Sequence, residues 1–491
     1  MLSDTTVDVL IVGAGISGID VAYRLQERCP ELTYTVLEGR DAIGGTWDLF
    51  RYPGIRSDSD IYTLSFPFYP WRGRDSIVDG AEILAHMEEA ARHFGIDRHI
   101  RLNSQVRAAH WSSADERWTV RVDANGTEQQ YTARFLVVCT GYYDYDSPHD
   151  AALPGLESFE GTLVHPQFWP DDLEVEGRRV AVIGSGATAI TLVPALAERG
   201  ASVTMIQRTP SYVLAYPRRD PVADVLRRVL PAKAAHHVMR ATNAGLQWGL
   251  YQASRRAPKA VTRLLRHRAI AGVGSAEFVD QHLTPPYGPW DQRLCVARDA
   301  DFFRAIRGGA ASVVTGRIDR ITPTGVQMAD GREVECDVLV TATGLRVRLF
   351  GGTDLTIDGE PVDLASTYVY QGAMLSGVPN LAFALGYLNL SWTMRTDLTA
   401  RFVARVLRRL TDSAATVVTP VLPDDLEKLG PPRPLLDMKA GYLTRAAAIL
   451  PRATGRYPWT LAQNIVRDAW AVNRADLDDG LEWGAGPAVS S

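Results

Sequence analysis

Two glycine-rich segments have the spacing needed to hold the pyrophosphate of a dinucleotide. The first contains Gly13, Gly15 and Gly18 after an apolar run, and Glu38 stands 25 positions after its first glycine. In such a unit the first glycine permits a tight turn, the second lets the backbone approach the pyrophosphate, and the third lets helix and strand pack closely. Amide groups at the helix N-terminus would bind the phosphates, and Glu38 would accept hydrogen bonds from ribose hydroxyls. A dinucleotide site is therefore predicted, against the alternative of a glycine turn without function.

The second glycine-rich segment, residues 184–189, follows another apolar run at 179–183. Its next apolar run, 202–207, ends in Arg208-Thr209, at the place where the first unit carries Glu38. An acid would repel a 2′-phosphate, whereas an arginine pairs with it. The second unit is therefore expected to bind NADP(H), and the first to bind FAD. The contacts expected in the second unit are Gly184, Ser185, Gly186, Ala187, Thr188, Ala189, Arg208 and Thr209.

The cysteines limit what a bound flavin could do. None of the four, Cys29, Cys139, Cys295 and Cys336, belongs to a Cys-x-x-Cys pair, which argues against a dithiol redox centre and against zinc. A flavin that takes hydride from NADPH and has no dithiol to reduce can react with oxygen. Such sparse cysteine usage is also typical of a reducing cytoplasm.

The sequence around these motifs reads as strand, glycine turn, helix and strand in both units. This order predicts an α/β fold with two Rossmann-like dinucleotide-binding domains and a helical insertion in the NADP-binding domain. We expect the FAD-binding domain at 1–149 and, with a C-terminal tail, at 346–491. The NADP-binding domain is expected at 150–212 and 291–345, interrupted by the insertion at 213–290. Strands are expected at 7–12, 33–37, 312–314, 325–328, 338–341 and 380–386, with helices to about residue 28, at 80–94 and at 397–410. A hairpin turn is expected at Asn125-Gly126, and disorder at 486–491.

Composition and charge exclude several other classes. With 46% hydrophobic and 22% charged residues, the chain of 491 residues is typical of globular proteins. Its net charge of -5 provides no attraction to nucleic acid, so no nucleic-acid partner is expected. The N-terminus lacks the basic region of a signal peptide, and the uncharged run 364–394 is too polar and broken to span a membrane. A cytoplasmic location is expected, and the sequence does not define the oligomeric state.

The insertion allows two interpretations. Residues 221–270 contain ten basic side chains and one acid, Asp224, with apolar positions at helical spacing. In the first interpretation these helices pack on the nucleotide domain and present a solvated basic face. In the second they form a basic amphipathic surface that makes peripheral contact with an anionic membrane.

The segment between the two glycine turns carries a resemblance to a known family. Residues 159–170 read F-x-G-x-x-x-H-x-x-x-W-P, which resembles the fingerprint of flavin-dependent Baeyer–Villiger monooxygenases. A second signature of that family is similar to Gly44-Gly45-x-Trp47, Tyr52-Pro53-Gly54 and Asp58. The longer phrases at 44–60 and 289–295 look most like the ethionamide-activating branch. The resemblance extends over nearly the whole chain.

This resemblance implies a reaction and its residues. NADPH would reduce FAD, oxygen would add to give a C4a-peroxyflavin, and the peroxide would convert a ketone to an ester or lactone; a thioether would be oxygenated at sulfur. Arg293 matches the active-site arginine, and Asp58 the acid that positions it. A permanently charged arginine suits a site where negative charge develops. Further FAD contacts implied are Ser17, Thr46, Trp47 and Val106, beside Gly13, Gly15, Gly18, Glu38, Gly45 and Asp58; further NADP contacts are Arg56 and Ser57.

Three points stay open at the level of sequence. His165 is expected to be a hydrogen-bonding hinge residue more than a proton donor, and Asn389 and Trp392 are candidates for facing the substrate. One alternative function is an oxygenase that acts only on nitrogen or sulfur. The other is a sensor that binds FAD and NADPH without turnover.

Overall fold

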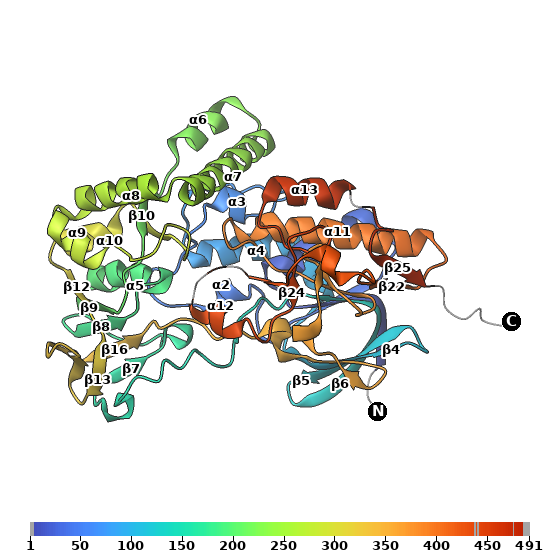
Figure 1. Ribbon diagram of the computed structural model, residues 1–491, viewed down its shortest axis with the longest axis horizontal. Helices are drawn as coiled ribbons and strands as arrows, with labels where there is room; N and C mark the ends of the chain where they lie inside the picture. The colour runs from blue at the N-terminus through green and yellow to red at the C-terminus, as the bar shows by residue number, and fades with distance from the viewer. Residues whose placement is uncertain (1–3, 437, 439–440, 475, 485–491) are drawn as a thin grey trace.

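The computed structural model describes residues 4–436, 438, 441–474 and 476–484. Two sheets built around parallel strands form the two main bodies of the molecule, and a pair of helices projects from its upper edge (Figure 1). The disorder expected at 486–491 lies outside the described residues.

The larger sheet has eleven strands and contains the first glycine turn. Its strand β1 (Asp4–Val12) runs parallel to β2 (Tyr34–Leu37) and to β6 (Thr127–Val138). Residues from both faces of β1 are buried, which accounts for its continuous apolar run. Helix α1 (Ile16–Arg28) follows the turn and packs against α11 (Trp392–Asp412), so the C-terminal part of the chain returns to this body. The predicted strands and helix are confirmed.

Antiparallel strands extend this sheet on one side. β4 (Ser104–Ser112), β5 (Arg117–Ala124) and β6 are neighbours, and Asn125-Gly126 joins β5 to β6. The φ angles of these two residues are 52° and 79°. Positive φ at both central positions is what a type I′ turn requires, and asparagine followed by glycine is the residue pair that adopts it most readily. The predicted hairpin is confirmed.

The smaller sheet contains the second glycine turn and is parallel throughout. Its order is β12 (Ala311–Thr315), β9 (Ser202–Gln207), β8 (Arg179–Ile183), β16 (Val338–Thr341) and β7 (Thr162–Val164). Helices α5 (Ala187–Glu198) and α10 (Asp301–Arg307) pack together beside it. Two Rossmann-like units in one α/β chain confirm the predicted fold class. A separate antiparallel sheet of β13 (Ile318–Thr322), β14 (Gly325–Met328) and β15 (Glu333–Glu335) lies next to this unit.

The insertion is helical, as predicted. It comprises α6 (Pro221–Val229), α7 (Ala232–Arg256), α8 (Pro258–Val273) and α9 (Ala276–His282), and β10 (Val213–Tyr216) and β11 (Cys295–Arg298) pair at its base. Asp220 caps α6 by accepting a hydrogen bond from the amide of Val222, with Pro221 at the first helical position. Figure 1 shows α6 and α7 projecting from the upper edge of the molecule.

The remaining predictions differ from the structure mainly at their boundaries. α4 (Gly80–His93) and β14 lie where they were expected, and β21 (Leu381–Phe383) is shorter than the predicted strand. α11 begins five residues before the predicted start at 397, because the apolar stripe that reveals it begins only at Leu398. The other elements are α2 (Thr46–Leu49), α3 (Ile61–Leu64), α12 (Gly441–Ala446), α13 (Ile465–Arg474), β3 (Ile100–Arg101), β17 (Asp354–Ile357), β18 (Glu360–Pro361), β19 (Val369–Tyr370), β20 (Met374–Leu375), β22 (Val417–Pro420), β23 (Arg433–Pro434), β24 (Arg452–Ala453) and β25 (Leu481–Gly484). Among the described residues, no helix has both the length and the apolar character needed to cross a bilayer.

Candidate active site

A cleft opens at the carboxyl ends of β1 and β2, where ligands of open α/β sheets bind. Its empty volume, which includes space open to solvent, is about 890 Å³. The glycine turn forms one wall: Gly13 has a φ of 103°, and a Cβ there would lie 2.6 Å from the carbonyl oxygen of Cys139. Gly15 is the N-cap of α1 and no side chain caps this end, which leaves amide groups of the first turn for a phosphate. This wall fits a pyrophosphate.

Glu38 lies in the same cleft, directly after β2. Its Oε2 accepts a hydrogen bond from the amide of Ala14 at 2.7 Å, and its Oε1 accepts one from the amide of Arg40 at 3.0 Å. Burial raises the pKa of this carboxyl, and the two amides oppose the rise. The turn thus holds the acid beside the glycines, where a ribose of FAD would need it.

Five of the residues expected to contact FAD line this cleft: Gly13, Gly15, Glu38, Gly45 and Val106. The others, Ser17, Gly18, Thr46, Trp47 and Asp58, do not line it, and their contact with FAD stays a prediction. The hydroxyl of Thr46 shares a short hydrogen bond with that of Tyr143, and Ser17 Oγ accepts one from Trp392 Nε1 at 3.0 Å. Gly18 packs against the backbone of Gly13, and Trp47 packs against the core.

Sequence reasoning missed an aromatic wall of the cleft. Tyr143 and Tyr145 both line it, and their rings stack with centroids 5.1 Å apart. Phe350 and Arg348 line it from a segment some two hundred residues further along the chain. The closely spaced tyrosines after Thr140-Gly141 were the one available signal, while nothing near Phe350 marked its segment.

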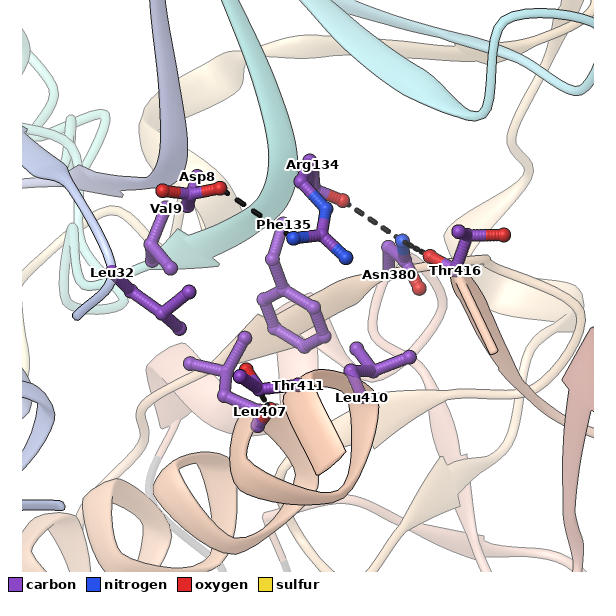
Figure 2. A pocket seen from close by; sticks show the side chains of 10 residues that line it. All are labelled: Asp8, Val9, Leu32, Arg134, Phe135, Asn380, Leu407, Leu410, Thr411 and Thr416. Atoms are coloured by element: carbon purple, nitrogen blue, oxygen red, sulfur yellow. Dashed lines mark hydrogen bonds and ion pairs between the residues drawn. The ribbon is translucent and has the colours of Figure 1, made fainter. Parts of the chain in front are cut away.

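A second, smaller recess does not belong to the site. It lies between β1, β6 and α11 and shares no lining residue with the cleft (Figure 2). Asp8 and Arg134 pair across it at 3.5 Å, and the amide of Asn380 donates to the carbonyl oxygens of Arg134 and Thr416. The contacts of Asn380 join the segment after α11 to the sheet, and Leu407, Leu410 and Thr411 of α11 line the recess, so the recess is part of the packing of that helix.

The second glycine turn has the geometry of a nucleotide site. Gly184 has a φ of 145°, and a Cβ at Gly186, the N-cap of α5, would meet no atom within 4 Å. Ser185 Oγ donates to the carbonyl oxygen of Thr209 at 2.8 Å, which fixes the turn against the end of β9. Of the other expected contacts, Ala187 begins α5, Thr188 is hydrogen-bonded to the hydroxyl of Tyr52, and Ala189 is fully buried.

Arg208 is the group that would distinguish NADP from NAD. It follows β9 directly, its side chain is exposed, and it forms no ion pair within the described part of the chain. A guanidinium in this position can pair with a 2′-phosphate in two parallel hydrogen bonds. The residues present therefore fit NADP(H).

Arg56 and Ser57 make contacts within the protein. The guanidinium of Arg56 pairs with Asp301, and Ser57 Oγ accepts a hydrogen bond from the amide of Ser59 at 3.0 Å. Both side chains are buried, and both belong to the loop between α2 and α3. Their direct contact with NADP stays a prediction.

The structure brings Asp58 and Arg293 into one electrostatic environment. Removal of water raises the pKa of the Asp58 carboxyl, while the charges of Arg293 and Arg56 and the amide of Val296 oppose the rise. Arg293 itself is exposed and makes no ion pair within 4 Å of any described acid. Both charges also act on the buried thiol of Cys295, whose pKa is raised mainly by burial. Arg293 is therefore a cation with an acid nearby and its hydrogen-bond donors available.

Residues 159–170, which carry the family fingerprint, belong to the second nucleotide-binding unit. Of these, residues 162–164 form β7, the edge strand beside β16. His165 Nδ1 accepts a hydrogen bond from the amide of Gln167 at 3.2 Å, and the side-chain amide of Gln167 donates to the carbonyl oxygens of Asp144 and Tyr145 at 2.8 and 3.0 Å. Burial, with His149 nearby, lowers the pKa of His165 to about 4. A neutral imidazole that orders the chain at 165–167 agrees with the expected hinge role of His165.

The two candidates for facing substrate are both partly engaged. Asn389 Nδ2 donates to the carbonyl oxygen of Gln463 at 2.8 Å, and its Oδ1 is buried without a hydrogen-bond partner among the residues that the structure describes. The ring of Trp392 stacks on Tyr142 with centroids 5.4 Å apart. Their contact with substrate stays a prediction.

Known proteins agree with this architecture. A family model described as "Pyridine nucleotide-disulphide oxidoreductase" matches residues 10–216. All four cysteines of the chain are free and buried, so the match concerns nucleotide binding. Among solved structures, a steroid monooxygenase bound to NADP aligns with a TM-score of 0.78 at 22% identity, over 98% of this chain and 100% of that one. A cyclohexanone monooxygenase bound to ε-caprolactone aligns with a TM-score of 0.75 at 21% identity, over 98% and 100%. At such identities these structures show the fold.

Closer relatives show the family. The FAD-containing monooxygenase EthA of Mycobacterium tuberculosis is 46% identical over 484 residues, which is 98% of each chain. The probable FAD-binding monooxygenase AlmA of Acinetobacter baylyi is 41% identical over 97% of this chain and 95% of its own. The predicted FAD cofactor is thereby confirmed. A glycine turn, an acid-bearing cleft and full-length identity above 40% all lead to the same conclusion: the chain belongs to the FAD-containing monooxygenases.

Proposed function

We propose that this monooxygenase is of the Baeyer–Villiger type: it uses NADPH and O2 to convert a ketone to an ester or lactone, and it also oxygenates thioethers. The observation that carries the proposal is the exposed guanidinium of Arg293 in the electrostatic field of Asp58. Two named neighbours support it, since one is a cyclohexanone monooxygenase with a lactone bound and the other a steroid monooxygenase with NADP bound.

The residues of the chain divide the work between binding and charge stabilisation. FAD, when bound, supplies the electrons and the site of oxygen activation. The first glycine turn and Glu38 hold it, and the second turn with Arg208 holds NADP(H). Arg293 keeps its positive charge at any working pH and stabilises negative charge that develops on oxygen during attack on a carbonyl. Its donors are not committed to an ion pair among the described residues, so they are available for this task.

Asp58 is the positioning residue for Arg293. Its carboxylate attracts the guanidinium, and its placement is set by the loop that Arg56 anchors to Asp301. Desolvation raises the pKa of this acid, and the charges of Arg293 and Arg56 oppose that rise by favouring the ionised form. The loop after the first glycine turn thus reaches the segment that follows the insertion.

The test is the replacement Arg293→Ala, followed in two separate half-reactions. Reduction of bound FAD by NADPH should continue, because the two glycine turns and Arg208 are unchanged. Ester formation from a ketone should fall by about 100-fold to 1,000-fold, the usual effect of removing one group that stabilises charge in a transition state. Arg320→Ala, an exposed arginine of β13, is the matched control. Normal ester yield from Arg293→Ala would contradict the proposal.

A panel of a ketone and a thioether, assayed with the unmodified enzyme, separates the alternatives. Product from both agrees with the proposal. Product from the thioether alone would identify a heteroatom oxygenase, and no NADPH-dependent oxygen consumption would identify a binding protein without turnover.

A further inference from the structure

The charge of this chain is strongly segregated into the helical insertion. The whole protein has a net charge of -5, yet residues 221–270 carry ten basic side chains and one acidic one. Four of these basic residues have partners: Arg255 pairs with Asp291, Arg266 with Asp280, Arg240 is buried on α3, and Arg227 donates to the hydroxyl of Tyr62. Six others are exposed and form no ion pair within the described ranges: Arg228, Lys233, Arg256, Lys259, Arg263 and Arg268.

Helix α6 presents apolar side chains to solvent. Val222, Val225 and Val229 are 54%, 57% and 68% exposed, and their spacing of three and four places them on one face. The opposite side of the helix is fixed to the protein. Ala223 is buried there, and the guanidinium of Arg227 lies 5.5 Å from the ring centroid of Tyr62. The helix therefore has one anchored face and one apolar face without a partner in the described chain.

Helix α7 has the same division over its central part, residues 238–246. Its 25 residues extend about 37 Å at 1.5 Å per residue. The exposed face carries Val238, Ala241, Thr242, Gly245 and Leu246, and Leu246 is 64% exposed. Arg240 is the one charged residue between Lys233 and Arg255, and it points to the other side. The exposed face thus carries no lysine, arginine or acid between Lys233 and Arg255, and His237 is the exposed polar ring on it.

The buried face of α7 is held firmly against the main body. Arg240 Nη1 donates to the carbonyl oxygens of Tyr62, Thr63 and Ser65 at 2.9, 3.0 and 2.7 Å. Asn243 and Gln247 donate to the carboxylate of Asp60 at 3.0 and 2.7 Å. These polar contacts fix the helix, so its outer face is presented in one orientation and is not a loosely packed core face.

We infer that α6 and α7, with the basic residues at the α6–α7 and α7–α8 junctions, form a surface that docks on an anionic lipid bilayer. The apolar faces of the two helices would enter the boundary between headgroups and acyl chains, and the flanking lysines and arginines would bind lipid phosphates. In Figure 1 the helix pair lies at the upper edge of the molecule, and both sheets lie below it.

A second copy of the chain is a poorer occupant of this surface. A symmetric dimer would bring two strongly basic surfaces together, and like charges across an interface oppose association. A bilayer containing anionic lipid supplies the complementary charge and an apolar phase together. The inference concerns a surface away from the cleft and does not depend on the type of oxygenation.

The test uses the full-length, FAD-loaded protein and vesicles of phosphatidylcholine with or without phosphatidylglycerol. Sedimentation should show binding only to vesicles that contain phosphatidylglycerol, and binding should weaken as salt rises. The variant R256E/K259E/R263E, which reverses three exposed charges, should lower the partition coefficient at least about tenfold. V225S/V229S should also lower it several-fold. R317E/R320E, on and beside β13, reverses exposed charges elsewhere and should leave it unchanged.

All variants should oxidise NADPH at the unmodified rate in the absence of vesicles, since none of these residues lines the cleft. Three results would overturn the inference. One is the absence of binding to phosphatidylglycerol vesicles, and another is equal binding by all variants. The third is a change of mass in light scattering for V225S/V229S with vesicle binding unaltered, which would assign the surface to self-association.

Discussion

Arg56 and Asp301 form a buried ion pair that joins the two nucleotide-binding units. Arg56 Nη1 lies 2.6 Å from Asp301 Oδ2, and the side chain of Arg56 is 2% exposed. Arg56 Nη2 also donates to the carbonyl oxygen of Val296 at 3.3 Å. Arg56 belongs to the loop that carries Asp58, and Val296 lies three residues after Arg293. The pair therefore fixes the distance between the two segments on which the proposed chemistry depends.

Breaking this pair from one side should be costly. Asp301→Ala leaves the Arg56 guanidinium buried without a counter-charge, which typically costs about 3–5 kcal/mol of stability. The double variant Arg56→Met with Asp301→Ala removes both charges and should recover a large part of that loss. Urea unfolding followed by tryptophan fluorescence gives the midpoints, and Asp280→Ala, which breaks the exposed pair with Arg266, should shift them little. A double variant as unstable as Asp301→Ala would refute this account of the pair.

Arg208 should determine the choice of nicotinamide cofactor. Replacement by alanine removes a charge-assisted contact to the 2′-phosphate, so the KM for NADPH should rise about 10-fold to 100-fold. The KM for NADH, which lacks that phosphate, should change little. Steady-state kinetics with each cofactor measure the two values. Arg199→Ala, an exposed arginine after α5, is the control, and equal rises for NADPH and NADH would argue against the role of Arg208.

The local parts of this structure could be predicted from the sequence. Gly13 and Gly184 occur where a turn requires positive φ, and the strands before them are short apolar runs. The sequence therefore predicts both nucleotide-binding units and their order along the chain. The hairpin at Asn125-Gly126 was found for the same reason, since its turn chemistry is complete within two residues. Such features need no knowledge of distant contacts.

The parts that were missed depend on partners far along the chain. Asp301 lies 245 positions from Arg56, and no periodicity or motif links the two, so Arg56 was expected to bind NADP and its internal partner was unforeseen. β7 contains only three residues, and it is a strand because β16 lies beside it. Phe350 also lines the cleft, although it lies some two hundred residues after Tyr145 in the chain. Tertiary pairing decides these positions, and a single sequence does not contain that information in readable form.

Two buried histidines should make the fold sensitive to acid. His86 and His236 are 5% and 3% exposed, and desolvation, the main cause in both, lowers their pKa to about 4 and about 3. Arg240 and His237 lower that of His236 further. Since an unfolded histidine has a pKa near 6.5, the unfolded state binds protons first as the pH falls. The free energy of unfolding should therefore be highest at pH values well above 6.5. It should fall progressively as the pH drops from 6.5 toward the pKa values of the folded state.

His236→Phe should reduce this loss, because it removes a group that is buried neutral and makes no hydrogen bond to a described residue through either ring nitrogen. Relative to the unmodified protein, the variant should gain about 2 kcal/mol between pH near 7.5 and pH near 5, from the shift of some 1.5 units below the unfolded pKa. Urea midpoints at the two pH values measure the gain. His267→Phe, an exposed histidine of α8, is the matched control and should show none. If His236→Phe changed the midpoint equally at both pH values, its effect would come from packing, and protonation of His236 would not contribute to acid unfolding.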